Sequence, residues 1–186
     1  VFDVCLILHA DHTFNASTFA AREVASTRAH MYSAVSAAVG ALSGELHGGA
    51  NYEVMKMLLD IKDENNATNW VKSRIEKGDR IMGMGHAVYK TVDPRSMVLK
   101  ELSKKLSAKT GLPWYNITKK VEETTSEIMK NRKERDIFPN VDLYSASVYY
   151  MLNIPMDLNT PIFAISRVSG WAAHVIEEKF AEAAPK

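Results

Sequence analysis

Apolar residues recur along this chain at the spacing of an α-helix. Val54, Met57, Leu58 and Ile61 fall at i, i+3, i+4 and i+7, so they share one helical face. The same reasoning predicts helices at 16–42 (one or two tightly packed helices), 54–61, 69–77, from Pro94 to Gly111, about 121–128, 141–152, and from Pro161 onward. Residues 63–69 are polar and typical of a turn.

No stretch alternates apolar and polar residues for long enough to form a strand, and no internal repeat is present. Two segments, 42–50 and 83–95, contain too many glycines and prolines to continue a helix. The predicted fold class is all-α, with helices separated by short, glycine-containing loops.

Composition excludes several classes of protein. The 186 residues are 46% hydrophobic, which is enough for a substantial core. The net charge of +1 gives no basic excess to attract nucleic acid or an anionic membrane surface, so we expect neither as a partner. Cys5 is the single cysteine, which excludes an intrachain disulfide. No apolar run approaches the roughly 18 residues that span a bilayer.

His9 and His12 flank Asp11, and on one helical face the two imidazoles would suit a metal ion. The alternative is a polar segment whose histidines form hydrogen bonds within the protein. The chain has no HExxH motif, and no further cluster of potential metal ligands lies near His9 and His12 in the sequence, so we expect no metal site.

His47 and His86 both lie in glycine-rich segments, GELHGGA and GMGHAVYK. A histidine in such a loop can reach a ligand without obstruction, although glycines also simply end helices. Gly83 and Gly85 begin a GxGxxG pattern, but Val88 replaces its third glycine and no strand precedes it. A dinucleotide site is therefore excluded.

Three charged residues have both a structural and a functional interpretation. Arg95 and Arg167 each need an anion, which is either an internal carboxylate or a ligand. Asp142 stands at a predicted helix start, where an aspartate commonly caps the helix. The residues alone leave these alternatives open.

Five segments together resemble the citrate synthase family: LHADH (8–12), GELHGGANYEV (44–54), GMGHAVYKTVDPR (83–95), PNVDLYS (139–145) and FAISRVSGW (163–171). The resemblance runs along nearly the whole chain but covers only about the C-terminal half of the family's usual length. It implies an all-helical fold with a large domain (1–49 and 154–186) and a small mobile domain (50–153) that closes over the substrates.

The resemblance also implies the chemistry. Oxaloacetate and acetyl-CoA would be the substrates, joined without a cofactor. Asp142 would remove the α-proton of acetyl-CoA, and a neutral His47 would donate a hydrogen bond to the thioester oxygen. His86 would polarise the ketone of oxaloacetate. His12, Arg95 and Arg167 match the residues that hold oxaloacetate, and Lys90, Lys133 and Arg135 would meet the CoA phosphates.

The family acts as a homodimer whose oxaloacetate site includes an arginine from a C-terminal tail of the partner subunit. This chain begins at Val1 without an initiator methionine and ends at Lys186 before such a tail, so we expect it to be part of a longer protein. Its expected location, by default, is the cytoplasm. Three enzymatic or binding alternatives stay open: a 2-methylcitrate synthase, the synthase-like module of a citrate lyase, and a non-catalytic helical interaction module.

Overall fold

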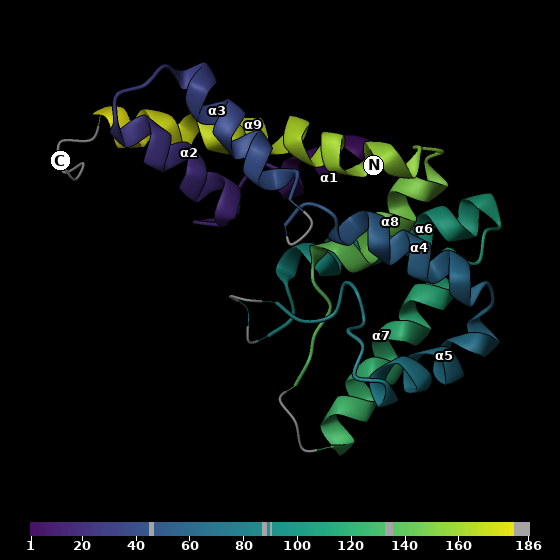
Figure 1. Cartoon of the computed structure of the whole chain (residues 1–186). Coiled ribbons are helices and arrows are strands. Elements are labelled where there is room, and N and C mark those ends of the chain that lie inside the picture. The colour runs from purple at the N-terminus through teal and green to yellow at the C-terminus, as the bar shows by residue number, and fades with distance from the viewer. Residues whose placement is uncertain (45–46, 87–88, 90, 133–135, 181–186) are drawn as a thin grey trace. The chain divides into compact units, whose positions relative to one another are not determined.

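A computed structural model describes residues 1–44, 47–86, 89, 91–132 and 136–180 (Figure 1). The regular elements of these residues are helices: α1 (Phe2–His9), α2 (Ala16–Ser26), α3 (Met31–Leu42), α4 (Ala50–Ile61), α5 (Glu64–Glu76), α6 (Pro94–Thr110), α7 (Trp114–Asn131), α8 (Val141–Met151), the 3-10 turn η1 (Met156–Leu158) and α9 (Asn159–Phe180). The predicted all-α class is confirmed.

The chain divides into two compact units. Unit 1 comprises residues 1–49 and 160–186, and unit 2 comprises residues 50–159. Residues 154–159, which the sequence assigns to the last segment, group with unit 2. One reason is that the Asn159 side chain donates a hydrogen bond to Asn51 Oδ1 at 2.7 Å.

Unit 1 is held together by α2, α3 and α9, which pack around one core. This core consists of Ala21, Ala25, Ala34, Ala38, Leu42, Trp171 and Val175. Because most of these side chains are alanines, the helix backbones approach closely, and the large Trp171 ring fills the remaining space. The segment 16–42 therefore forms two helices, separated by a turn in which Arg28 has a φ of 65°.

Unit 2 is built around α8, whose residues 143–149 are all buried. Helices α4, α6 and α7 contact it, and α5 packs against α7 (Figure 1). A fully buried Leu or Val side chain stabilises the fold by about 1.5–3 kcal/mol, so α8 is firmly fixed along its length. The start of α8 is consequently a rigid place for a functional side chain.

One expectation from the sequence is wrong. Residues 64–68 are helical rather than a turn, because Asp63 caps α5 by accepting a hydrogen bond from the Asn65 N–H at 2.8 Å. The arrangement that the sequence analysis set aside, with His9 and His12 on one helix, is not formed, since α1 ends at His9. His9 is buried and its Nδ1 lies 2.7 Å from the Cys5 carbonyl oxygen, as expected for a histidine that forms hydrogen bonds within the protein.

Candidate functional site

Two segments of unit 2 are joined beside the start of α8. The Gly85 N–H donates to the Phe138 carbonyl at 2.7 Å, and the Asn140 N–H donates to the Gly83 carbonyl at 2.9 Å. The Asn140 side chain adds a third bond, to the Gly85 carbonyl at 2.9 Å. Gly83 and Gly85 have φ values of 79° and 88°, which other residues rarely adopt. These bonds fix His86 close to the first turn of α8.

Asp142 lies in that first turn. The N-cap is Asn140, whose side chain accepts from the Asp142 N–H at 2.9 Å. The structure thus excludes the interpretation of Asp142 as the N-cap. The helix dipole at this position favours the ionised carboxylate.

The His86 ring is fixed as one tautomer when it is neutral. Its Nδ1 accepts a hydrogen bond from the Tyr89 N–H at 3.1 Å, and a backbone N–H can only donate. The proton of the neutral ring is therefore on Nε2. Partial burial lowers the pKa of His86; the nearby Asp93 charge raises it in part and Arg95 lowers it further. The imidazole is thus neutral at pH 7 and carries an Nε2–H donor.

Arg95 is held by a buried carboxylate. Its Nε and Nη2 donate to the two oxygens of Asp93 at 3.0 and 2.7 Å, and Asp93 is 0% exposed. Burial alone would raise the pKa of Asp93, but the hydrogen bonds and charge of Arg95 outweigh it and lower that pKa. This pair uses one edge of the guanidinium. The N–H groups of Nη1 have no protein acceptor among the described residues, so they can meet an anionic ligand.

In unit 1, His47 occupies a tight turn after α3. The His47 N–H donates to the Gly44 carbonyl at 3.0 Å, and Thr160 Oγ donates to the Gly48 carbonyl at 2.9 Å. A Cβ on Gly48 would lie 2.1 Å from the Leu42 carbonyl oxygen. Glycine is thus required next to His47 for the chain to pass this close to α3.

Ser17 fixes the His47 ring. The Ser17 N–H donates to His47 Nε2 at 3.3 Å, and Ser17 Oγ lies 2.9 Å from the same nitrogen. Because the backbone group can only donate, the neutral ring has its proton on Nδ1. Ser17 is itself oriented by Trp171 Nε1–H and by Asn15 Oδ1, at 3.2 and 2.7 Å. Burial lowers the pKa of His47, and the positive charge of Arg167 lowers it further.

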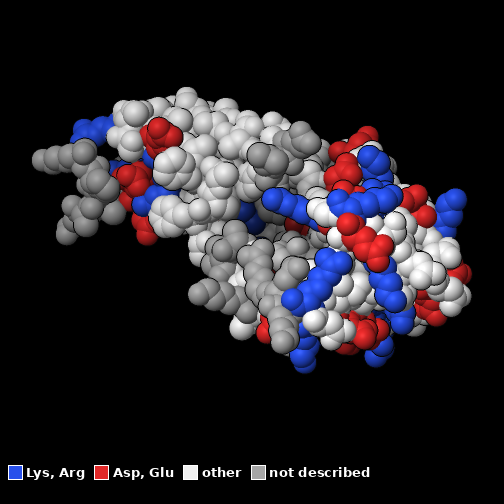
Figure 2. All heavy atoms as spheres, turned by 60° about the horizontal axis from the view of Figure 1, so that its bottom comes forward, with Lys and Arg blue, Asp and Glu red and all other residues white. Residues whose placement is uncertain are grey.

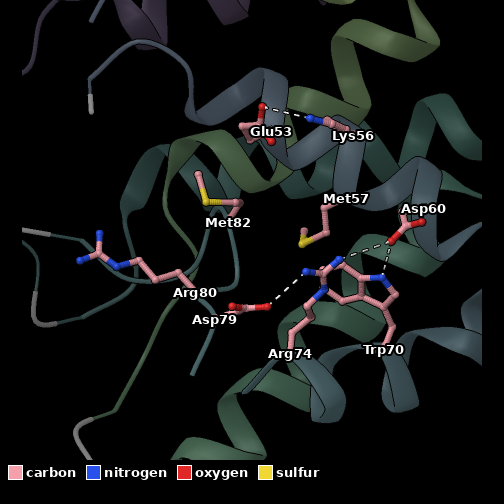
Figure 3. A pocket seen from close by; sticks show the side chains of 9 residues that line it. All are labelled: Glu53, Lys56, Met57, Asp60, Trp70, Arg74, Asp79, Arg80 and Met82. Atoms are coloured by element: carbon pink, nitrogen blue, oxygen red, sulfur yellow. Dashed lines mark hydrogen bonds and ion pairs between the residues drawn. The ribbon is translucent and has the colours of Figure 1, made fainter. Parts of the chain in front are cut away.

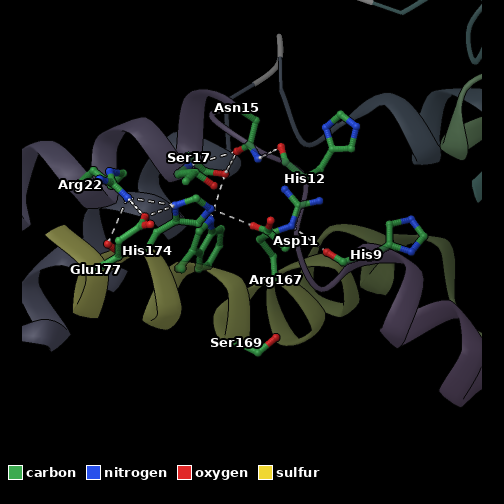
Figure 4. Close-up of polar contacts among 12 residues, drawn as sticks. His9, Asp11, His12, Asn15, Ser17, Arg22, Arg167, Ser169, His174 and Glu177 are labelled. Atoms are coloured by element: carbon green, nitrogen blue, oxygen red, sulfur yellow. Dashed lines mark hydrogen bonds and ion pairs between the residues drawn. The ribbon is translucent and has the colours of Figure 1, made fainter. Parts of the chain in front are cut away.

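His12 and Arg167 belong to the same part of unit 1 (Figure 4). His12 lies on the loop between α1 and α2, and its carbonyl accepts from Asn15 Nδ2 at 3.1 Å. Arg167, on α9, is 2% exposed; its Nε donates to the His9 carbonyl at 2.7 Å, and its guanidinium lies 4.6 Å from the centre of the Phe163 ring.

The predicted site residues fall into two sets. Unit 1 holds His12, His47 and Arg167, and unit 2 holds His86, Arg95 and Asp142. Lys90, Lys133 and Arg135 lie outside the described residues. Sequence reasoning missed Ser17 and the Asn140 side chain. Asn140 had a recognisable signal, a capping residue directly before a helix, whereas nothing in the local pattern marks Ser17 as the partner of a histidine thirty positions away.

Unit 2 has a pocket of about 670 Å³ beside His86. Residues 78–86 form one wall, and Asn140 and α7 contribute to the others. Two cations, Arg80 and Arg132, line it together with one carboxylate, Asp79, which pairs with Arg74 at 3.2 Å. The pocket therefore brings positive charge and glycine-rich backbone next to a neutral imidazole, a combination that suits an anionic ligand.

A second pocket of unit 2, about 570 Å³, lies over α4 and α5 (Figure 3). Three acidic and three basic side chains line it. Arg74 pairs with Asp79 at 3.2 Å and stacks on Trp70 at 4.8 Å, while the Trp70 N–H donates to Asp60 at 2.7 Å. Arg80 lines this recess as well as the pocket beside His86.

Neither a metal cluster nor a membrane span is found in the described part of the chain. Those residues contain no group of three or more His, Cys, Asp or Glu side chains arranged to bind a metal ion. None of the described helices is long and apolar enough to cross a membrane. Figure 2 shows Lys and Arg mixed with Asp and Glu over the visible surface of unit 2.

Residues 1–184 match the family described as citrate synthase, C-terminal domain. The chain is 49% identical over 179 residues to a citrate synthase of Haloferax volcanii, covering 95% of this chain and 46% of that protein. It is 46% identical over 178 residues to 2-methylcitrate synthase 1 of Corynebacterium glutamicum, covering 95% of this chain and 45% of that protein. The chain thus spans about half the length of these relatives.

A solved structure gives the same result. The citrate synthase of Thermoplasma acidophilum, in a ternary complex with carboxymethyl coenzyme A and oxaloacetate, superimposes with a TM-score of 0.87. The two sequences are 38% identical, and the match covers 96% of this chain and 47% of that one. The sequence resemblance and the fold therefore agree.

Proposed function

Since this chain belongs to the citrate synthase family, we propose that its protein condenses acetyl-CoA with oxaloacetate and water to give citrate and CoA. The single observation that carries the proposal is the state of two imidazoles. In His47 and in His86, a backbone N–H fixes one nitrogen as an acceptor, and burial keeps the ring neutral. Each ring thus offers its one proton as a hydrogen-bond donor to a developing oxyanion.

The reaction begins at the methyl group of acetyl-CoA, whose proton is only weakly acidic. Asp142 removes this proton, and the negative charge passes to the thioester oxygen. His47 stabilises that oxygen by donating a hydrogen bond from Nδ1. A neutral imidazole suits this role because the acidity of its N–H group is better matched to that of an enol than the acidity of an imidazolium is, as in other enzymes that form enediolates.

The enol carbon then attacks the ketone of oxaloacetate. His86 donates from Nε2 to the ketone oxygen, which becomes an alkoxide in the transition state. Preorganised donors of this kind typically contribute about 10²–10³-fold each. Hydrolysis of the resulting citryl thioester by water releases CoA, so the reaction needs no cofactor.

Arg95, Arg167 and His12 bind the two carboxylates of oxaloacetate. The support for Arg95 is its geometry: Asp93 occupies one edge of the guanidinium and orients the other. Arg167 is almost fully buried on α9, where a charged group is stabilised only by strong hydrogen bonds or an anion.

Acyl-CoA occupies the pocket beside His86. The support is the presence of Arg80 and Arg132, which can bind phosphates, together with glycine-rich backbone along residues 83–86. Lys90, Lys133 and Arg135 extend this phosphate-binding set in the proposal.

The protein acts as a homodimer in this proposal, with a second copy as the occupant of the apolar surface of unit 1. Several apolar side chains there are exposed, including Tyr32 at 79%, Val39 and Ile165. Figure 2 shows mainly uncharged atoms over this unit. Light scattering on Tyr32→Arg, compared with the wild-type protein, tests it: a shift from dimer to monomer supports the interface, and an unchanged dimer contradicts it.

A second candidate is 2-methylcitrate synthase, because the chain is 46% identical to one such enzyme. Propionyl-CoA has one more methylene than acetyl-CoA, and such a difference changes selectivity by only about 1–3 kcal/mol. The synthase-like module of a citrate lyase is a third, and it predicts citrate cleavage in place of condensation.

The proposal is tested by measuring CoA release from acetyl-CoA and from propionyl-CoA, with and without oxaloacetate, using the protein expressed from its complete gene. Faster release from acetyl-CoA that depends on oxaloacetate supports a citrate synthase. Faster release from propionyl-CoA would instead identify a 2-methylcitrate synthase. No release by a folded protein would contradict both.

A further inference from the structure

The loop that carries His12 lies directly on α9. Residues 10–15 connect α1 to α2, and Thr13 has a φ of 50°. Opposite the loop is Gly170, on α9. A Cβ at Gly170 would lie 2.3 Å from the Ala10 carbonyl oxygen and 2.8 Å from an Asp11 carboxylate oxygen. The loop therefore depends on the surface of α9 for its position.

His174, one turn after Gly170, links this loop to α2 (Figure 4). Its Nε2 lies 3.1 Å from Asp11 Oδ1, and its Nδ1 lies 3.2 Å from Arg22 Nη1. A guanidinium N–H can only donate, so Nδ1 is the acceptor. The ring is consequently neutral, with its proton on Nε2, and donates that proton to Asp11.

Arg22, Asp11 and Glu177 surround the His174 ring, and the Arg22 contact decides which nitrogen accepts. Arg22 is held in place by ion pairs with Glu177 and, at 2.7 Å, with Glu178. Glu177 is also 3.8 Å from His174 Nδ1, too far for a hydrogen bond. The Phe14 ring meets His174 edge to face at 5.4 Å. An additional proton on Nδ1 would face the Arg22 guanidinium, so a charged ring would break the link.

We propose that His174 is a positioning residue: its neutral imidazole connects Arg22 to Asp11 and so holds the loop that presents His12. This inference rests on the proposed function, which assigns His12 to oxaloacetate. His12 is then anchored on both sides, by Asp11 before it and by the Asn15 side chain on its own carbonyl. Loss of one anchor changes the placement of His12 without removing any group that touches substrate.

The test compares His174→Leu with His174→Gln. Leucine removes both hydrogen bonds, whereas the glutamine amide can donate to Asp11 and accept from Arg22. We expect His174→Leu to raise the KM for oxaloacetate roughly tenfold or more, the scale of a lost hydrogen bond to a charged group, with little change in the KM for acyl-CoA. The KM of His174→Gln for oxaloacetate should be close to that of the wild-type protein.

His30→Leu is the matched control. His30 is also in unit 1 and caps α3 by accepting from the Tyr32 N–H at 3.3 Å, but it is exposed and takes no part in the loop contacts. We expect it to leave the KM for oxaloacetate unchanged. Equal KM values for wild type and a folded His174→Leu protein would overturn the proposal, as would a His174→Gln protein as impaired as His174→Leu.

A second measurement needs neither variant nor activity. In protein labelled with ¹⁵N at histidine, the His174 ring nitrogens at pH 7.5 should show the neutral tautomer with its proton on Nε2. A charged ring, or a proton on Nδ1, would contradict the proposal. If the wild-type protein releases no CoA, the proposed function fails, while this spectrum still decides how His174 is linked to its neighbours.

Discussion

Replacement of Asp93 separates two contributions that one buried carboxylate makes to unit 2. Asp93 caps α6 by accepting from the Arg95 N–H at 3.0 Å, and it forms the ion pair with the Arg95 guanidinium. Asparagine is a good N-cap, so Asp93→Asn keeps the cap and loses the charge. Asp93→Ala loses both.

The size of each effect follows from burial. Breaking a fully buried ion pair costs about 3–5 kcal/mol. Because the Arg95 side chain retains 11% exposure, the lower end applies, and Asp93→Asn should lower the free energy of unfolding by about 3 kcal/mol. Loss of the cap adds about 1 kcal/mol, which gives about 4 kcal/mol for Asp93→Ala.

Urea unfolding followed by circular dichroism measures the free energy of unfolding of both variants. The same substitutions in an Arg95→Met background separate the energy of the Asp93–Arg95 ion pair from the other effects of each substitution. In that background Asp93→Asn should cost less than about 1 kcal/mol. The pKa of Asp93 is lowered in the folded state. The ionised carboxylate therefore contributes its full share to the free energy of unfolding above the unfolded pKa near 3.8, and this share is lost as the pH falls below that value. If both variants were within about 0.5 kcal/mol of wild type at pH 7, the pairing would contribute nothing.

Three further substitutions test the framework around the proposed site. Gly83→Ala should destabilise the protein by more than about 2 kcal/mol, since φ is 79° and the new Cβ would lie 2.8 Å from Leu143 Cα; thermal unfolding measures this. Asn51→Ala should cost about 2–3 kcal/mol in urea unfolding, because it removes the buried bond to Ser145 Oγ at 2.6 Å. Burial lowers the pKa of His47 below its usual 6.5, so the folded state loses stability as the pH falls below that value; His47→Gln should lose less stability on the same acidification, measured by urea unfolding.

The sequence predicted the helices best where the residue that begins or ends the helix has a strong conformational preference of its own. Pro94 begins α6 and Gly111 ends it in the left-handed conformation, both as expected. The prediction failed at residues 64–68, because the polar residues there suggested a turn. Their helical state depends on the Asp63 cap and on Ala67, which is buried with Val71 and Ile75 in the packed fold.

The site followed a similar rule. The motifs identified the residue types that could carry chemistry, but the tautomers of His47 and His86 depend on backbone N–H groups that only the fold brings into place. The sequence likewise left Arg95 with two interpretations. In the structure Asp93 binds one edge of its guanidinium, which confirms the internal carboxylate, and binding of a ligand by Arg95 stays a prediction.

Condensation by Asp142 is tested most directly by comparing wild type with Asp142→Asn in the protein expressed from its complete gene. The measurement is oxaloacetate-dependent release of CoA from acetyl-CoA, together with oxaloacetate binding by calorimetry. Loss of a general base lowers turnover by about 10²–10⁴-fold, and oxaloacetate binding should persist because the residues proposed to bind oxaloacetate are unchanged. Wild-type turnover in Asp142→Asn would contradict the assignment of Asp142 as the base.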